Sequence, residues 1–176
     1  ERQGICRYIH FGTGNYNEVT SSIYSDISLF TCDEQLGSDS IAFFNAISGY
    51  SAPQSLQQLV YAPTELRQTL LELIQNETAL AKLGKEAAID AKLNSLVDRA
   101  VVEALYDAST AGVKIRLNIR GICTLRPQVP GMSENITVTS IVDRFLEHAR
   151  VFCFLNDGHH KVFTASADWM GRNLDK

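Results

Sequence analysis

Ala87-Ala-Ile-Asp-Ala-Lys-Leu93 is followed by residues 98–111 and by Val113-Lys-Ile-Arg-Leu-Asn-Ile119, and these three segments decide the fold class of the chain. The first and the third are short runs that contain apolar residues and predict two strands. The middle segment repeats apolar residues at helical spacing between Asp98 and Gly112, which predicts a helix. One helix that crosses over between two strands is the unit of a parallel sheet, so the sequence predicts an α/β protein.

The segments on either side extend this pattern. Upstream, leucine and isoleucine recur at helical spacings, which predicts a long helix that opens at residues 62–65 and closes at Gly84. Downstream, residues 121–134 hold two prolines and two glycines and predict a long loop. A helical turn is expected at residues 142–147. Three further strands are expected, at residues 136–141, 151–155 and 161–165.

The first quarter of the chain predicts a second, smaller unit. Residues 5–11 form a strand-like run, and a second β-prone run covers residues 22–31. Between them, a glycine-rich turn predicts a loop. Asp33 is expected to cap a short helix that ends at Gly49.

The polar, proline-containing segment at residues 49–58 has no period of either kind and predicts a linker. We therefore expect two domains, at residues 1–57 and 58–176. The chain begins at Glu1 without a methionine and enters a strand-like run within a few residues. We expect it to be a piece of a longer protein, with a truncated first domain and an incomplete second one.

Composition argues against several classes of protein. The chain has 176 residues, is 45% hydrophobic and carries a formal net charge of −4, which disfavours binding of nucleic acid or anionic membrane through a diffuse basic surface. Its four cysteines form no C-x-x-C pair and predict neither a zinc site nor a disulfide framework. No apolar run approaches the roughly 20 residues of a membrane span. We expect reduced thiols and a cytoplasmic location.

Two residues suit phosphate chemistry by their position. His148 lies among Arg144, Glu147 and Arg150 at the end of the predicted helical turn, where cations and a carboxylate can tune an imidazole. Arg120 ends an apolar strand, so its guanidinium is expected at the carboxyl edge of the parallel sheet, where α/β proteins bind ligands. Arginine binds phosphate through a bidentate fork. A surface histidine and a strand-end arginine in solvent are the alternatives that the residues alone leave open.

Other polar groups carry weaker signals. Gly12-Thr-Gly-Asn15 can form a nest of N–H groups for phosphate, but it lacks the lysine and the following helix of a P-loop. Tyr24 lies in a strand-like run, where such a side chain either packs half-buried or stacks on a base. His159 and His160 follow the turn Asn156-Asp-Gly158 and are expected in solvent.

Several longer strings, taken in order, resemble one family. From about Arg7 to the last residue, the chain resembles the C-terminal half of bacterial polyphosphate kinase. The order and spacing of several long motifs are more specific than any single motif. The strings are Arg7-Tyr-Ile-His10-Phe-Gly-Thr-Gly-Asn-Tyr16, Gly121-Ile-Cys-Thr-Leu-Arg-Pro127 with Pro130-Gly-Met-Ser-Glu-Asn135, Arg144-Phe-Leu-Glu-His148, and Ser166-Ala-Asp-Trp-Met-Gly-Arg-Asn173.

The resemblance implies two phospholipase-D-like domains, each with a mixed α/β sheet flanked by helices. It implies reversible transfer of the terminal phosphate of ATP to inorganic polyphosphate through a phosphohistidine, in a homo-oligomer that binds ATP or ADP and no nucleic acid. The nucleophilic histidine, in a His-x-Lys motif, and the arginines associated with Mg²⁺ are expected upstream of Glu1. Tyr24, Arg120 and His148 match residues that contact ATP, with His148 as hydrogen-bond donor or general acid. His10 matches a histidine that supports the nucleophile.

Two alternatives stay open. A phospholipase-D-type phosphodiesterase would share the fold but is expected to show two full His-x-Lys motifs, and none occurs here. The string His159-His-Lys161 is similar to one, yet the aspartate that normally follows is missing. The other alternative is a piece that binds nucleotide or polyphosphate without catalysis, and we expect the chain in isolation to be inactive.

Overall fold

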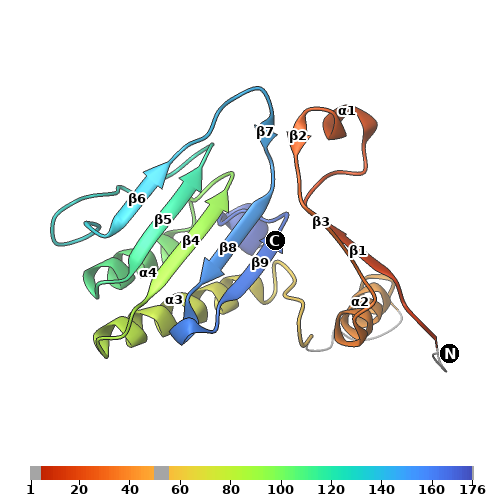
Figure 1. Ribbon diagram of the computed structural model, residues 1–176, viewed down its shortest axis with the longest axis horizontal. Helices are drawn as coiled ribbons and strands as arrows, with labels where there is room; N and C mark the ends of the chain where they lie inside the picture. The colour runs from red at the N-terminus through yellow and green to blue at the C-terminus, as the bar shows by residue number, and fades with distance from the viewer. Residues whose placement is uncertain (1–4, 50–55, 176) are drawn as a thin grey trace.

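The computed structural model describes residues 5–49 and 56–175 (Figure 1). Its largest element is a five-stranded mixed sheet in the order β6-β5-β4-β8-β9. β4, β5 and β6 run parallel, whereas β8 is antiparallel to both β4 and β9. The parallel β4–β5 pair confirms the predicted strand–helix–strand unit. The strands are β4 (Ala88–Leu93), β5 (Lys114–Ile119), β6 (Ile136–Thr139), β8 (Arg150–Phe154) and β9 (Lys161–Ala165).

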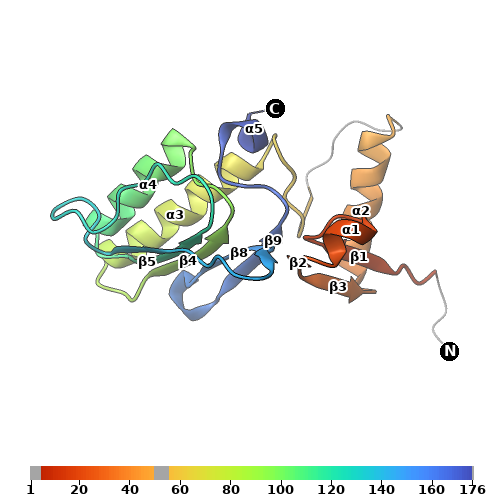
Figure 2. The ribbon, with the colours of Figure 1, turned by 90° about the horizontal axis from the view of Figure 1, so that it is seen from above.

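Two helices cover one face of this sheet (Figure 2). They are α3 (Leu66–Lys82) and α4 (Arg99–Thr110), and α4 crosses over between β4 and β5. Alternate residues of β4 are buried, as expected for a strand with helices on one side only. The core between the sheet and the helices consists of large apolar side chains that are buried, among them Leu70, Ile74, Ile89, Leu105 and Ile115.

The first part of the chain forms a separate small layer. β1 (Ile9–Gly12) pairs antiparallel with β3 (Ser28–Thr31), and α1 (Glu18–Ser21) and β2 (Tyr24–Ser25) lie in the connection between them. The helix α2 (Glu34–Ile47) follows.

The predicted start and end of α2 are confirmed. The carboxylate of Asp33 accepts hydrogen bonds from the N–H groups of Gln35 and Leu36, as an N-cap residue does. Gly49 has a φ of 76°, in the left-handed region that favours glycine after a helix.

A short parallel sheet joins the two parts of the chain (Figure 1). In it, β2 pairs with β7 (Leu146–Glu147), so that Tyr24 lies opposite Leu146 and Ser25 opposite Glu147. This pairing links segments that are more than a hundred residues apart in the sequence, and the candidate site lies beside it.

Asp39 of α2 makes a second connection between the two parts. It is only 5% exposed, and its carboxylate accepts hydrogen bonds from the N–H groups of Gln57, Gln58 and Leu59 at 2.6 to 3.1 Å. Burial alone would raise the pKa of Asp39, but these hydrogen bonds outweigh it and hold that pKa below its ordinary value. The carboxylate therefore fastens the start of the second part to α2.

The remaining elements are short. A 3₁₀ turn, η1 (Asn156–Gly158), connects β8 to β9, and α5 (Gly171–Leu174) follows β9. A long loop connects β5 to β6, as predicted for residues 121–134. Within residues 5–49 and 56–175, no helix is long and apolar enough to cross a membrane.

The prediction of a helical turn at residues 142–147 is wrong. Residues 146–147 form strand β7 instead, because the N–H of Leu146 donates to the carbonyl of Ile23 at 2.9 Å. That partner is distant in the sequence, so no local pattern indicates the strand. The run at residues 22–31 also differs from the prediction, because it divides into β2, which pairs with β7, and β3, which pairs with β1.

Two starting positions and one short helix differ from the prediction as well. The first strand begins at Ile9 and the long helix at Leu66, so both start a few residues after their predicted positions. Helix α1, capped by the side chain of Asn17, was not predicted because it is only four residues long. Residues 50–55 of the predicted linker lie outside the described residues.

Candidate functional site

Tyr24 and His148 meet where β2 pairs with β7. The carbonyl of Ser25 accepts hydrogen bonds from the N–H groups of His148 and Ala149, both at 3.1 Å. The ring centroids of Tyr24 and His148 are 4.6 Å apart, with a tilt of 33° between the planes. Tertiary pairing therefore brings together two of the residues that the sequence singles out.

The imidazole of His148 contacts a carboxylate that the sequence analysis missed. Its Nδ1 lies 2.8 Å from Oδ1 of Asp26, and the hydroxyl of Thr13 donates to the same oxygen at 2.8 Å. The side chains of His148 and Asp26 are 12% and 20% exposed. Because a carboxylate only accepts hydrogen bonds, it favours a proton on Nδ1 of the ring. The other ring nitrogen, Nε2, then stays available for a ligand or a proton transfer.

The glycine turn at residues 12–15 supports Asp26. The N–H of Thr13 donates to the carbonyl of Ile27, and the N–H of Ile27 donates to the hydroxyl of Thr13, both at 3.0 Å. A Cβ atom at Gly14 would lie 2.7 Å from Oδ2 of Asp26, so the carboxylate approaches closely only because this residue is glycine. The turn packs on the carboxylate partner of His148. The prediction that it forms a phosphate nest remains untested.

Arg120 follows β5, at the carboxyl edge of the parallel strands. Its Nε donates to the carbonyl of Glu147 at 3.0 Å, and the residue is half-buried. Among the described residues, the two Nη groups have no hydrogen-bond partner, so they remain available to a ligand. Glu147 also pairs through its carboxylate with Nζ of Lys92, at 2.5 Å. Arg120 thus contacts the residue directly before His148.

A buried ion pair contacts the backbone of His148. Arg150 and Asp168 are paired at 3.1 Å between Nη2 and Oδ2, and Nη1 of Arg150 donates to the carbonyl of His148 at 3.0 Å. Burial would raise the pKa of Asp168, but Arg150 and the hydrogen bonds from Ser95 and Asn94 outweigh it and hold that pKa below its ordinary value. Nothing in the sequence around either residue indicates that the two pair.

His10 lies on β1, and its ring stacks on Phe30 with centroids 4.3 Å apart and also contacts the hydroxyl of Tyr16. Within the described ranges, no hydrogen bond, ion pair or ring contact joins it to Tyr24, Arg120 or His148. Its predicted supporting role remains untested. The other two histidines, His159 and His160, are exposed, as predicted.

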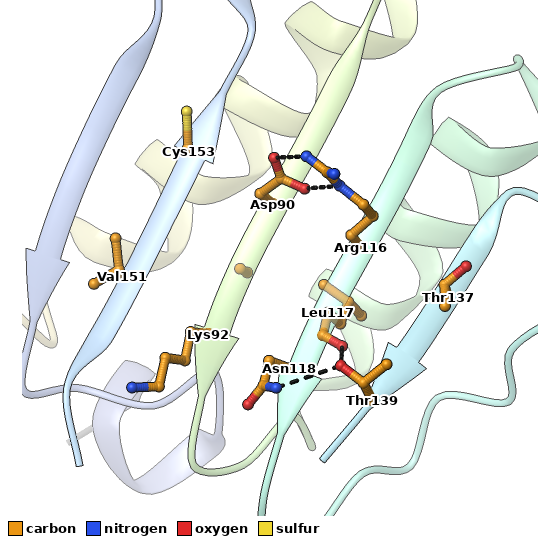
Figure 3. Close-up of a pocket in the computed structure, with 10 residues that line it drawn as sticks. Asp90, Lys92, Arg116, Leu117, Asn118, Thr137, Thr139, Val151 and Cys153 are labelled. Atoms are coloured by element: carbon orange, nitrogen blue, oxygen red, sulfur yellow. Dashed lines mark hydrogen bonds and ion pairs between the residues drawn. The ribbon is translucent and has the colours of Figure 1, made fainter. Parts of the chain in front are cut away.

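The face of the large sheet that carries no helices has a shallow cavity of about 420 Å³ (Figure 3). Asp90 and Arg116 form a two-pronged ion pair across neighbouring strands there, with both distances 2.6 Å. Lys92 lines the same cavity and pairs with Glu147, so one end of the cavity adjoins the candidate site. The rest of the lining is mixed, with Asn118, Thr139, Val151 and Cys153 among it.

The described residues do not fit a magnesium site of protein ligands. Over residues 5–49 and 56–175, no group of three or more His, Cys, Asp or Glu side chains is placed to hold a metal ion. Asp26, the carboxylate nearest to His148, is occupied by the histidine and by Thr13.

Two family models match the chain. Residues 1–53 match the model described as polyphosphate kinase C-terminal domain 1, and residues 59–176 match polyphosphate kinase C-terminal domain 2. A polyphosphate kinase of Rhodopirellula baltica is 62% identical over 176 residues, which is all of this chain and 21% of that protein. One from Dictyostelium discoideum is 50% identical over the whole chain and 17% of its own length. The chain therefore spans about a fifth of the length of these relatives.

A solved structure gives the same fold. The crystal structure of polyphosphate kinase from Porphyromonas gingivalis matches 94% of this chain and 27% of its own, at 40% identity and a TM-score of 0.87. The predicted fold class, a phospholipase-D-like mixed α/β sheet flanked by helices, is confirmed by this match.

Proposed function

Because the chain belongs to the polyphosphate kinase family, we propose that it contributes part of a site that transfers the terminal phosphate of ATP reversibly to inorganic polyphosphate. The observation that carries this proposal is the cluster of Tyr24, Asp26, Arg120 and His148 at the β2–β7 junction. Phosphoryl transfer depends mainly on positioning and on stabilising negative charge, and this cluster offers groups for both.

Arg120 would hold the oxygens of the transferred phosphate. Its Nε donates to the carbonyl of Glu147, which restrains the plane of the guanidinium and leaves the two Nη groups to bind a ligand. Arginine binds phosphoryl oxygens with two parallel hydrogen bonds, and such donors stabilise the charge that spreads over them in the transition state.

His148 would donate a hydrogen bond or a proton to the transferred phosphate through Nε2. Its Nδ1 is engaged by Asp26, which orients the ring and stabilises positive charge on it, as the carboxylate does in a carboxylate–histidine pair of other enzymes. Because Asp26 is held in turn by Thr13, the pair has a fixed geometry. This arrangement supports His148 as a general acid.

Tyr24 would contact the nucleotide. One side of its phenol lies against the imidazole of His148, and the residue as a whole is half-buried, so part of it remains exposed to a ligand. An aromatic ring at the rim of a phosphate site suits contact with a base or a ribose. We keep His10 as a supporting residue of the nucleophile in this proposal.

The nucleophile and the metal site of this function would lie in parts of the longer protein outside this chain. The phosphohistidine would form on a histidine outside this chain, and Mg²⁺ would be bound there as well. ATP or ADP and polyphosphate are the proposed substrates, with a cytoplasmic homo-oligomer as the working form. The division into domains at residues 1–57 and 58–176 also remains a proposal, which the separate family models support.

The phosphodiesterase alternative gains no support, since the family models and the relatives reported above are all described as polyphosphate kinases.

The proposal is tested in the longer natural protein that contains these residues, with ATP labelled on the terminal phosphate. His148→Gln and Arg120→Gln should each lower the incorporation of label into acid-insoluble polymer at least 100-fold, a loss in the range expected for a general acid or a phosphate-binding arginine. His159→Gln, an exposed histidine outside the cluster, is the matched control and should leave incorporation unchanged. Full activity of both cluster variants would reject the proposal.

A second arm uses the 176-residue chain by itself. Incubated with labelled ATP and Mg²⁺, it should take up no acid-labile label, whereas the longer protein should be labelled. Label on the isolated chain would make His148 or His10 the phosphoacceptor, and the roles proposed for these residues and for the upstream nucleophile would be wrong.

A further inference from the structure

We propose that the buried ion pair of Arg150 and Asp168 is a positioning device that sets the placement of His148 relative to Arg120. The inference rests on the proposed function, because it gives the pair a role through two residues that bind phosphate there. Arg150 and Asp168 are not assigned any contact with substrate. Each acts on the backbone that carries His148 or Arg120.

The pair lies almost entirely out of solvent. Arg150 is 7% exposed and Asp168 is 1% exposed. The guanidinium donates from Nε to Oδ1 at 3.2 Å and from Nη2 to Oδ2 at 3.1 Å, a two-pronged arrangement. Desolvation offsets most of the attraction in a buried ion pair, so stability alone does not explain it. What the pair adds is a set of directional hydrogen bonds that apolar side chains of similar volume cannot make.

On one side, the pair holds the backbone of His148. The third nitrogen of Arg150, Nη1, donates to the carbonyl of His148 at 3.0 Å. The N–H of His148 is held by the carbonyl of Ser25 at 3.1 Å, and its ring by Asp26. With both peptide groups and the ring engaged, a change at Arg150 moves His148 directly.

On the other side, the pair holds the backbone next to Arg120. Oδ1 of Asp168 accepts hydrogen bonds from the N–H groups of Asn94 and Ser95 at 2.9 and 3.1 Å. The carbonyl of Asn94 in turn accepts the N–H of Gly121 at 2.8 Å. A Cβ atom at position 121 would lie 2.7 Å from that carbonyl oxygen, so the close approach depends on glycine. Asp168 therefore positions Asn94, and the carbonyl of Asn94 positions Gly121, the residue after Arg120.

A last hydrogen bond closes these contacts into a ring. It runs from His148 through Arg150, Asp168 and Asn94 to residue 121, and from Arg120 back to the carbonyl of Glu147. In such a ring, neither phosphate-binding residue can shift without breaking a hydrogen bond. Catalysis is sensitive to such shifts, because a misplacement of about 1 Å can lower a rate by about 100-fold.

The decisive variant is Arg150→Lys, made in the longer natural protein that contains these residues. Lysine keeps the positive charge opposite Asp168. Its single ammonium lacks the planar guanidinium that bonds Asp168 and the carbonyl of His148 at the same time. We expect kcat per folded molecule to fall on the order of 10- to 100-fold, while the thermal midpoint changes by only a few degrees. A purely structural role would lower the folded fraction and leave kcat per folded molecule unchanged.

A second variant separates stability from positioning. The double substitution Arg150→Met with Asp168→Leu removes both charges and fills the volume with apolar atoms, which often restores stability. We expect the thermal midpoint to recover relative to Asp168→Leu alone, with kcat still reduced at least 10-fold. The matched control is Arg116→Lys, in an exposed arginine–aspartate pair on the open face of the same sheet, and it should leave kcat unchanged.

The outcomes distinguish this inference from the proposed function. If Arg150→Lys keeps kcat per folded molecule within twofold of the natural protein while His148→Gln is inactive, only the positioning role is wrong. If His148→Gln itself is fully active, the proposed function fails, and the positioning role fails with it. If the double variant does not fold, Arg150→Lys alone decides.

Discussion

Replacing Asp26 with asparagine removes the negative charge that faces the imidazole of His148 and changes little else in shape. In the natural protein, Oδ1 of Asp26 lies 2.8 Å from Nδ1 of His148 and accepts a hydrogen bond from the hydroxyl of Thr13, also at 2.8 Å. The amide oxygen of asparagine can accept the same two hydrogen bonds. The variant therefore isolates the contribution of charge to the orientation of the ring and to its role as an acid.

The size of the effect follows from the strength of the hydrogen bond. A hydrogen bond to a charged group contributes about 1.5–3 kcal/mol and a neutral one about 0.5–1.5 kcal/mol, so the difference is about 1–2 kcal/mol. The side chains of His148 and Asp26 are 12% and 20% exposed, so solvent screens part of this difference. At about 1.4 kcal/mol for each factor of ten in rate, and with part of the difference screened, we expect kcat to fall roughly 3- to 20-fold.

The assay is steady-state transfer from labelled ATP in the longer natural protein at pH 7, with kcat and KM for ATP determined separately. The loss should appear mainly in kcat, because the charge acts on proton donation rather than on nucleotide binding. The control is Asp107→Asn, which makes the same change at an exposed carboxylate on α4 that contacts neither Asp26 nor His148. The reasoning would be refuted by a kcat within twofold of the natural value in a folded variant, or by a loss that lies entirely in KM.

The other predictions concern stability, measured by urea unfolding of the chain. Glu77 has no exposed surface, and its carboxylate accepts hydrogen bonds from two backbone N–H groups. Glu77→Ala should therefore lower the free energy of unfolding by about 2–5 kcal/mol. The control Glu103→Ala, at an exposed position, should lower it by less than about 0.5 kcal/mol. Asp39→Asn should destabilise the chain at pH 7. Because the folded pKa of Asp39 is lowered, its charge contributes stability above about pH 4 and loses it as the pH falls through that folded pKa. The difference between the natural chain and Asp39→Asn should therefore shrink at pH 3, and an equal difference at both pH values would contradict this reading. Leu70→Ala, at a fully buried position in α3, should cost about 2–5 kcal/mol, against almost nothing for Leu83→Ala, which is 75% exposed.

Local pattern was sufficient wherever an element and its partner are neighbours in the chain. β4, α4 and β5 follow one another, so their periods, the aspartate at the start of the helix and the glycine after it predicted the unit correctly. Strands β8 and β9 were predicted for the same reason, and the structure shows that they pair. Asp33 and Gly49 marked the ends of α2 because capping depends on a few adjacent residues.

The candidate site was predicted only in part. Arg120 was placed correctly at the end of β5, since a strand end can be read from the sequence. Asp26 was missed, although one signal was present: it stands two residues after Tyr24, as strand residues on one face do. Arg150 likewise stands two residues after His148, and its partner Asp168 was named only within one of the strings that resemble the family.

The sequence by itself determined most of the elements of this chain and its family, because helical and strand periods, caps and long ordered motifs are written in neighbouring residues. The tertiary structure alone decided which of the singled-out residues meet. Residues 146–147 have no local reason to be a strand, and they become one because β2 offers free backbone groups more than a hundred residues earlier. That pairing places His148 on Asp26 and Tyr24, since hydrogen bonds and ring contacts depend on distance in space and not on separation along the chain.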